Sequence, residues 1–309
     1  MSRSGTIALL GRPNAGKSTL VNALLGEKVA IVSATPQTTR HRITGVLTEA
    51  RGQAVFFDLP GVHRPLHRLN VQMMHALRDT LAEVDVILQL FDASADPGAG
   101  EEFVVGLLDG VTAPAVLVAN KVDLQGVRAR LDERTAFYTS RHAYAATAAI
   151  SALTGERLPE LKATIFALLP EGEPWLDPTL TTTQSERFFV TELIREAMLE
   201  RVKKELPFTS TVHLRQFEEE GSGGLLRIFA DIVVDRDSQK GIVVGRAGAM
   251  IKEIGSAARA RIEALLGVRV YLDLRVKARP GWREDGGFLS ELDQVEASWT
   301  DAGGEPDGP

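Results

Sequence analysis

The 309-residue sequence contains no cysteine, which excludes disulfide bonds and metal sites built from thiolates. Aromatic residues make up only 6% of the chain, and no apolar run reaches the length of a membrane-spanning helix. The apolar run near the N-terminus stops at Gly11 and is too short for a signal peptide. These absences predict a soluble protein of the cytoplasm, and the length favours about two domains.

The net charge of −6 is unevenly distributed. Residues 240–283 carry ten basic and three acidic side chains, whereas residues 284–309 carry eight acidic and no basic ones. The basic stretch indicates either an anionic partner or a solvated helix face that keeps the domain soluble. The acidic residues 284–309, which end in a run rich in glycine and proline, predict a disordered tail.

Apolar runs alternate with segments of helical periodicity through residue 168. This alternation predicts an α/β domain over residues 1–170, with a mainly parallel sheet and helices on both faces. The expected strands are 6–10, 43–48 (a more polar edge strand), 54–58, 84–93, 114–120 and 144–151, and the expected helices include 17–25, 69–83 and 156–168.

Residues 171–184 are rich in proline and threonine and predict a linker. Beyond them, residues 185–283 predict a small α+β domain of order αββααβ. Its expected elements are a helix at 185–205, strands at 209–218 and 225–235, two helices that flank the glycines of GIVVGRAGAM, and a strand at 268–277.

The stretch GRPNAGKST, residues 11–19, matches the phosphate-binding pattern of a glycine, four residues and Gly-Lys-Ser. It follows an expected strand and opens an expected helix, so its backbone N–H groups should surround the β-phosphate. Lys17 should contact the β- and γ-phosphates, and the Ser18 hydroxyl should bind Mg²⁺.

Asp58-Leu-Pro-Gly61 closes the next buried strand. Asp58 is expected to hold Mg²⁺ through water, and the Gly61 N–H to contact the γ-phosphate. A hydroxyl from the loop before it should complete the Mg²⁺ shell. Thr39 is the preferred candidate because it directly precedes Arg40, and Thr38 is the alternative.

Asn120-Lys121-Val-Asp123 ends another strand, where ligands gather in open α/β sheets. The Asp123 carboxylate can accept hydrogen bonds from two neighbouring donors of guanine that adenine lacks, which disfavours an ATP-using kinase. Asn120 should hold the base pocket together, Lys121 should cover the ring, and Ser151-Ala152 should offer a backbone N–H to guanine O6. The pattern predicts a GTP-binding site formed by Gly11, Arg12, Pro13, Asn14, Ala15, Gly16, Lys17, Ser18, Thr19, Asp58, Leu59, Pro60, Gly61, Val62, Asn120, Lys121, Asp123, Ser151 and Ala152.

The turn Gly245-Arg246-Ala247-Gly248 joins two short expected helices. In K-homology (KH) domains such a turn clamps the backbone of about four nucleotides, whereas a simple helix-turn-helix corner is the alternative. The αββααβ order and the local charge favour single-stranded RNA. Lys240, Lys252, Arg259 and Arg261 are expected to lie around the turn. The expected RNA-binding residues are Lys240, Gly245, Arg246, Ala247, Gly248, Lys252 and Arg259.

From about residue 5 to residue 283 the chain resembles the Era family, bacterial GTPases with a C-terminal type II KH domain. The resemblance rests on GRPNAGKSTL, PQTTRHRI, DLPGVHRPLHRLN, NKVD, SERFFVTELIRE, SQKGIVVGRAGAMIKEIG and RVKARPGW. The chain departs from the family at Leu59, at Ala247 and in the acidic tail. The substitution at Ala247 bears on the fine geometry of RNA contacts.

The resemblance implies a GTP-hydrolysing factor for assembly of the small (30S) ribosomal subunit, with a KH domain that binds the 3′ end of 16S rRNA. It also implies a monomer with peripheral association at the inner membrane in some settings. A second hypothesis is a GTP-dependent signalling switch whose basic domain docks on protein or anionic lipid.

Hydrolysis is expected to be slow and to use Asn14, Lys17, Thr39 and Gly61. Many small GTPases place a glutamine after Asp-x-x-Gly to orient the attacking water, but this chain has Val62 there. The resemblance implies that Asn14 holds a K⁺ ion near the β–γ bridge. The alternatives are that Asn14 only braces the loop, and that a ribosomal group completes catalysis.

Overall fold

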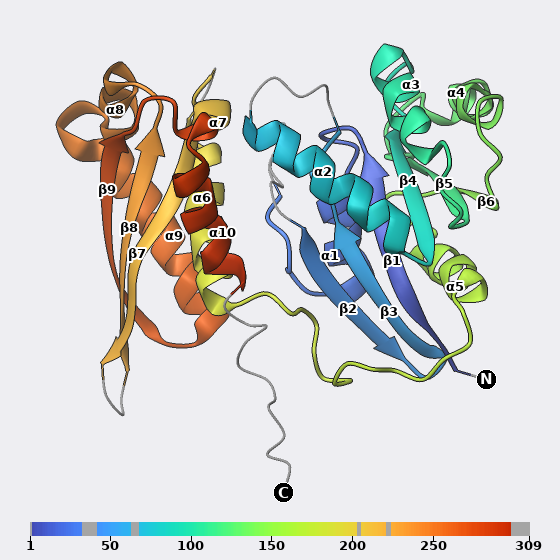
Figure 1. Cartoon of the computed structure of the whole chain (residues 1–309), viewed down its shortest axis with the longest axis horizontal. Coiled ribbons are helices and arrows are strands. Elements are labelled where there is room, and N and C mark those ends of the chain that lie inside the picture. Colours follow the sequence, from blue (N-terminus) through green and yellow to red (C-terminus); the bar gives the residue numbers. More distant parts are fainter. Residues whose placement is uncertain (1, 33–41, 63–67, 203–204, 221–223, 298–309) are drawn as a thin grey trace, which may run out of the picture. The chain divides into compact units, whose positions relative to one another are not determined.

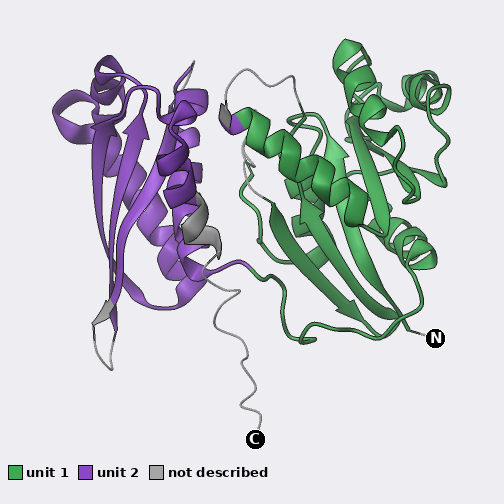
Figure 2. Ribbon diagram, in the orientation of Figure 1, with its two compact units in different colours: residues 1–32, 36–66, 70–183 green, residues 33–35, 67–69, 184–309 purple. Residues whose placement is uncertain are grey.

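The computed structural model in Figure 1 describes residues 2–32, 42–62, 68–202, 205–220 and 224–297. These residues form two compact units, coloured separately in Figure 2. The first consists of residues 1–32, 36–66 and 70–183, and the second includes everything from Gln184 onward. The division falls at the end of the predicted linker.

The first unit is built on a six-stranded sheet of order β2-β3-β1-β4-β5-β6. All neighbouring strands run parallel except β2, an edge strand that pairs antiparallel with β3, so the predicted parallel sheet and edge strand are confirmed. The strands are β1 (Arg3–Gly11), β2 (Ile43–Glu49), β3 (Gly52–Asp58), β4 (Val86–Asp92), β5 (Ala115–Asn120) and β6 (Ala146–Ala149).

Helices cover both faces of this sheet, which is why the apolar residues of β1 are buried without alternation. Ala8 and Leu10 point into a core shared with α2, and α1 lies behind the sheet (Figure 1). The helices of this unit are α1 (Lys17–Leu25), α2 (Arg68–Glu83), α3 (Ala99–Val105), α4 (Leu131–Thr139) and α5 (Leu158–Leu168), with short 3-10 turns at Gly106–Leu108 and Arg128–Arg130.

The segment predicted as a linker is fastened to the first unit. The buried Gln53 amide accepts hydrogen bonds from the backbone N–H groups of Trp175 and Leu176 and donates to the Leu176 carbonyl at 3.0 Å. Further along, the Val46 N–H donates to the carbonyl of Thr181 at 2.8 Å. The segment therefore follows the surface of β2 and β3 up to the start of the second unit.

The second unit has the predicted αββααβ order around a three-stranded sheet, β7-β8-β9. Strand β8 pairs antiparallel with β7 and parallel with β9. The elements are α6 (Glu186–Leu199), α7 (Leu206–Thr209), β7 (Ser210–Glu220), β8 (Leu225–Val234), α8 (Asp237–Val244), α9 (Ala249–Leu266), β9 (Arg269–Ala278) and α10 (Gly286–Ala297), with 3-10 turns at Arg246–Gly248 and Trp282–Glu284.

The first helix of this unit begins as the sequence indicates, because the Ser185 hydroxyl accepts a hydrogen bond from the Phe188 N–H and caps it. It ends at Leu199, however, and not at residue 205. A separate short helix, α7, follows, and Pro207 at its start fits the first turn of a new helix better than the interior of a long one.

The predicted disordered tail at 284–309 is wrong for residues 286–297, which form α10. Phe288 and Leu289 are each 2% exposed and pack with Trp282 and Val233 in a small core, which Leu292 also contacts. Apolar residues at this helical spacing outweigh the acidic composition of the segment. Residues 298–309 lie outside the described part of the chain.

We expect Phe288→Ala to destabilise the second unit by roughly 3–5 kcal/mol, because it removes a fully buried ring. The measurement is the free energy of unfolding from denaturant titration. Ser290→Ala, an exposed change on the same helix, should shift it by less than about 0.5 kcal/mol. Equal stabilities for the two variants would show that α10 is not part of the core.

Candidate functional site

The predicted nucleotide-binding motifs meet at one edge of the first sheet. Gly11 ends β1, Asp58 ends β3, Asn120 ends β5, and Ser151 follows β6. These strands are parallel, so their carboxyl ends meet at the same edge, where ligands bind in open α/β sheets. The fold therefore brings together motifs that are up to 140 residues apart.

The Lys17 ammonium group lies inside the loop that connects β1 to α1. It donates to the carbonyls of Gly11 at 3.0 Å and Arg12 at 3.2 Å, and the residue is 6% exposed. Burial lowers the pKa of Lys17 from 10.5 to about 8, although the negative charge of Asp58 opposes the change. A buried lysine with carbonyl partners can exchange them for an anionic ligand, which would favour its charged form.

Ser18 and Asp58 are adjacent at the mouth of this loop. The Ser18 hydroxyl donates to Oδ2 of Asp58, and Asp58 is fully buried at the end of β3. A hydroxyl and a carboxylate are the oxygen ligands that Mg²⁺ prefers, so the residues present fit the predicted metal. Thr38 and Thr39, the two candidates for the remaining ligand, lie outside the described residues.

The Asp-x-x-Gly turn closely approaches the phosphate-binding loop. A Cβ on Gly61 would lie 2.7 Å from the Cα and N of Pro13, so only glycine fits there. The Val62 N–H donates to the Gly11 carbonyl at 3.1 Å, while its side chain is 1% exposed and packs in the core with Leu59. Val62 thus supplies packing at the position where other GTPases place a water-orienting glutamine.

One buried side chain, Asn120, joins three loops of the site. Its Nδ2 donates to the Ala15 carbonyl at 2.9 Å, and its Oδ1 accepts from the N–H of Ala152 at 2.9 Å and of Lys121 at 2.8 Å. Asn120 is 2% exposed. The amide therefore holds the phosphate-binding loop against both segments predicted to contact the base.

The remaining residues of the predicted base site differ in exposure and in hydrogen-bond partners. Asp123 is exposed, so its carboxylate is accessible to a ligand. The Lys121 ammonium group contacts Oδ2 of Asp92 at 2.6 Å. Burial alone would raise the pKa of Asp92. The hydrogen bonds that Asp92 forms with Lys121 and Ser94 have the larger combined effect, and the pKa of Asp92 is lowered. An N–H of Ser151-Ala152 is predicted to bind guanine O6, and both already have partners: that of Ser151 donates to the Glu156 carbonyl at 3.2 Å and that of Ala152 to Oδ1 of Asn120 at 2.9 Å. Either one would have to exchange its partner for the base.

Two other residues of the phosphate-binding loop, Asn14 and Arg12, are exposed, whereas Lys17 is buried. Asn14 is exposed and has a left-handed backbone with φ of 64°, a conformation that asparagine tolerates. The Arg12 side chain leaves the loop to pair with Glu101 of α3 at 3.2 Å. Arg12 therefore contributes to the site mainly through its carbonyl, which Lys17 contacts.

In the second unit, the predicted glycine turn separates α8 from α9. A Cβ on Gly245, whose φ is 72°, would lie 2.6 Å from Cβ of Met250, so the turn closes too tightly there for another residue. Gly248, with φ of 80°, has open space around it. Ala247 also has a left-handed backbone, with φ of 49°, which costs an alanine about 1 kcal/mol.

A groove of about 500 Å³ runs beside this turn, between α9 and the edge strand β9. The predicted Lys252 and Arg259 line it, and both are exposed. Sequence reasoning missed several other lining residues, because only the fold places β9 opposite α9. These are Ile251, Gly255, Ser256, Tyr271, Leu272, Asp273 and Leu274.

Two other basic residues named from the sequence do not line the groove. Arg261 turns towards α6, where it pairs with Glu196 at 3.1 Å and Glu200 at 2.7 Å. Lys240 of α8 pairs with Asp237 one turn away at 3.3 Å. The expectation that Arg261 lies around the turn is wrong, because it stands on the α6 side of α9.

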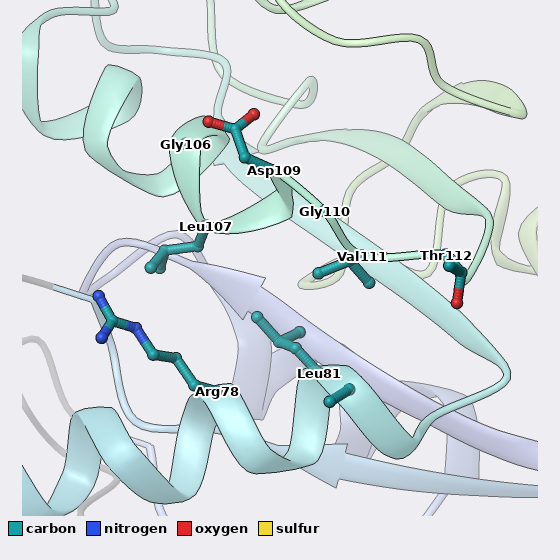
Figure 3. Close-up of a pocket in the computed structure, with 9 residues that line it drawn as sticks. Arg78, Leu81, Gly106, Leu107, Asp109, Gly110, Val111 and Thr112 are labelled. Carbon is teal, nitrogen blue, oxygen red and sulfur yellow. The ribbon is translucent and has the colours of Figure 1, made fainter.

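Figure 3 shows a different cavity, of about 430 Å³, in the first unit. It lies between Arg78 and Leu81 of α2 and the turn around Asp109 and Gly110. None of the residues predicted to bind nucleotide lines it.

Within the described ranges, no helix combines the length and apolar character needed to cross a bilayer.

Comparison with known proteins agrees with this division of the chain. Residues 6–121 match the model of the 50S ribosome-binding GTPase family, and residues 205–283 match the model of the KH domain. GTPase Era of Geobacter metallireducens is 44% identical over 290 residues, which cover 94% of this chain and 97% of that protein. The chain belongs to the Era family.

Other members agree in sequence and structure. Era of Heliobacterium modesticaldum is 44% identical and is covered over 94% of its length. A crystal structure of Era in complex with MgGDPNP and nucleotides 1506–1542 of 16S ribosomal RNA superposes with a TM-score of 0.90 at 34% identity, covering 94% of this chain and 98% of that one. The first unit is therefore a P-loop GTPase domain, the second is a KH domain, and the chain is a GTPase.

The Lys17 environment predicts how nucleotide affinity of this Era family member depends on pH. The phosphate-free site holds Lys17 with a pKa of about 8, and phosphate binding requires the charged form. Above pH 8 binding must therefore take up a proton, and GDP affinity should fall by about tenfold in total between pH 7 and pH 9. Titration calorimetry between pH 7 and pH 9 measures both the affinity and the proton uptake.

Guanosine, which shares the base but lacks phosphate, is the control and should show no such decline. A GDP affinity that stays constant across this range would show that Lys17 is fully charged in the free protein.

Proposed function

We propose that this GTPase binds the 3′ end of 16S rRNA through its KH domain and acts in assembly of the 30S subunit. The carrying observation is the Gly245–Gly248 turn, which opens beside a groove lined by Lys252 and Arg259. A related Era binds nucleotides 1506–1542 of that RNA. An Era family assignment does not favour the alternative of a signalling switch.

In the GTPase domain, we assign Lys17 to the β- and γ-phosphates, Ser18 and Asp58 to Mg²⁺, and Asp123 to guanine. The metal, when bound, neutralises charge on the phosphate oxygens. The chain itself contributes positioning and electrostatic stabilisation, which are the main needs of phosphoryl transfer. We assign the N–H of Gly61, which closely approaches Pro13, to the γ-phosphate.

Catalysis in this site also requires a group that replaces the missing glutamine. We assign this role to a K⁺ ion held by Asn14, whose exposed amide lies in the phosphate-binding loop. A monovalent cation there would offset charge on the bridging oxygen as an arginine finger does. Thr39, rather than Thr38, is the proposed loop ligand of Mg²⁺. The monomeric state, the cytoplasmic location and the membrane association remain predictions.

We expect Gly248→Asp to weaken RNA binding by at least tenfold while GTP hydrolysis without RNA is unchanged. The space around Gly248 accommodates the side chain, and aspartate tolerates the left-handed backbone there (φ of 80°) better than most residues do. The added charge then faces phosphate at close range. Replacing Gly245 is less informative, because any Cβ there collides with Met250. Fluorescence anisotropy with the 1506–1542 RNA measures the affinity. Wild-type affinity in the variant would place the RNA site elsewhere.

The K⁺ assignment predicts faster GTP hydrolysis in K⁺ than in Na⁺ at matched ionic strength, and loss of that difference in Asn14→Gly. Glycine removes the amide and suits the left-handed backbone at this position, whereas alanine would add strain. Phosphate release under single-turnover conditions is the measurement. If the wild-type protein hydrolyses GTP at the same rate in both salts, a ribosomal group is the better explanation.

A further inference from the structure

We propose that the uncovered face of the KH sheet is a second RNA-binding surface, which continues the groove across strand β9. We call it the open sheet face and define it by Arg215, Phe229, Tyr271, Arg275 and Lys277. This proposal rests on the RNA-binding function proposed above and extends the length of RNA that the domain contacts.

The strand pattern places these residues on the side of the sheet away from α6 and α9. Successive side chains of a strand point to opposite faces. Ile228, Ala230 and Ile232 of β8 belong to the core under α6 and α9, and Leu272, Leu274 and Val276 of β9 pack against it. Phe229, Tyr271 and Arg275 alternate with them and therefore point to the other face.

The open sheet face combines aromatic rings with cations. The rings of Phe229 and Tyr271 lie 5.9 Å apart across the strand pair, and the Arg215 guanidinium lies 5.9 Å from the Phe229 ring. Tyr271 is 49% exposed, and the side chains of Arg275 and Lys277 are 59% and 58% exposed. Single-stranded RNA is held by this combination, in which bases stack on rings and phosphates contact cations.

The acidic residues on this face do not neutralise all of its cations, and one of them, Glu218 of β7, lies opposite Arg227 of β8. Asp231 is 1% exposed and contacts both Arg215 at 2.9 Å and Lys277 at 2.7 Å. Asp273 lies 3.4 Å from Arg275. With one carboxylate shared by two cations, the defining residues keep a net positive charge, and Arg269 at the start of β9 adds to it.

Helix α10 limits the face at one end. Phe288 of α10 contacts His213, whose ring lies 5.4 Å away, and packs near Val233 in the small core. The opposite end of the sheet, around Phe229 and Tyr271, is not part of that core. The helix thus leaves the aromatic and basic part of the face accessible among the described residues.

The open sheet face is continuous with the groove. Tyr271 and Asp273 line the groove and also belong to the edge strand β9, so they stand between the two surfaces. A KH groove holds about four nucleotides, whereas the RNA bound by the related Era runs from nucleotide 1506 to 1542. RNA that leaves the groove over β9 would meet Tyr271 first and Phe229 next.

The test compares two RNAs on the full-length protein by fluorescence anisotropy. One is the 1506–1542 RNA, and the other is shortened stepwise from both ends until little more than the roughly four nucleotides of the groove remain. Arg275→Gln and Phe229→Ala should each lower the affinity for the long RNA by about tenfold and leave the affinity for the short RNA unchanged. Arg275→Gln should also reduce the slope with which the affinity for the long RNA falls with salt concentration, by about the contribution of one charge.

Arg187→Gln removes the same charge from α6, away from this face, and is the matched control. Equal affinities of Arg275→Gln and wild type for the long RNA, with unchanged melting temperature, would overturn the proposal. The proposal would also be overturned if these variants lost binding to phosphatidylglycerol vesicles but kept their affinity for RNA, because the face would then bind membranes. Failure of Gly248→Asp to weaken either RNA would instead refute the groove and with it the proposed function.

Discussion

The Asn120 amide is the interaction on which the nucleotide site depends. Its three hydrogen bonds connect the phosphate-binding loop, the strand end that carries Asp123 and the loop after β6. An amide is suited to this role because it donates and accepts at once. Because Asn120, Ala15 and Ala152 are all buried, removing the amide would leave the Ala15 carbonyl and the Ala152 N–H without these partners, which costs free energy.

The contacts of the site are close where phosphate is expected to bind and more open where the base is expected to bind. Lys17 is buried among carbonyls, and Gly61 abuts Pro13, so the loop has little freedom. Asp123 is exposed, and the Ala152 N–H holds a partner that it would exchange for guanine. Binding of the base can therefore change the hydrogen bonds of Asn120, and through them the contact with the phosphate-binding loop.

The sequence predicted the motifs and most elements, because local patterns encode them. Glycine spacing marks the phosphate-binding loop, and continuous apolar runs mark buried parallel strands. Contacts between distant residues were not predictable: Gln53 fastens residues 175–176, and Arg261 faces α6 although it neighbours the RNA turn in sequence. The error at α10 came from weighing acidic composition above the helical spacing of Phe288, Leu289 and Leu292.

Strand β2 connects these features physically. It begins directly after the segment that carries Thr38 and Thr39, the candidates for sensing the γ-phosphate. Its backbone also holds the linker, through the Val46 N–H to Thr181 at 2.8 Å and the Thr182 hydroxyl to the Thr44 carbonyl at 2.6 Å. The contact at Thr182 lies two residues before the KH unit begins. The edge strand of the GTPase sheet and the segment that leads to the RNA-binding domain are thus joined by hydrogen bonds as well as by the chain.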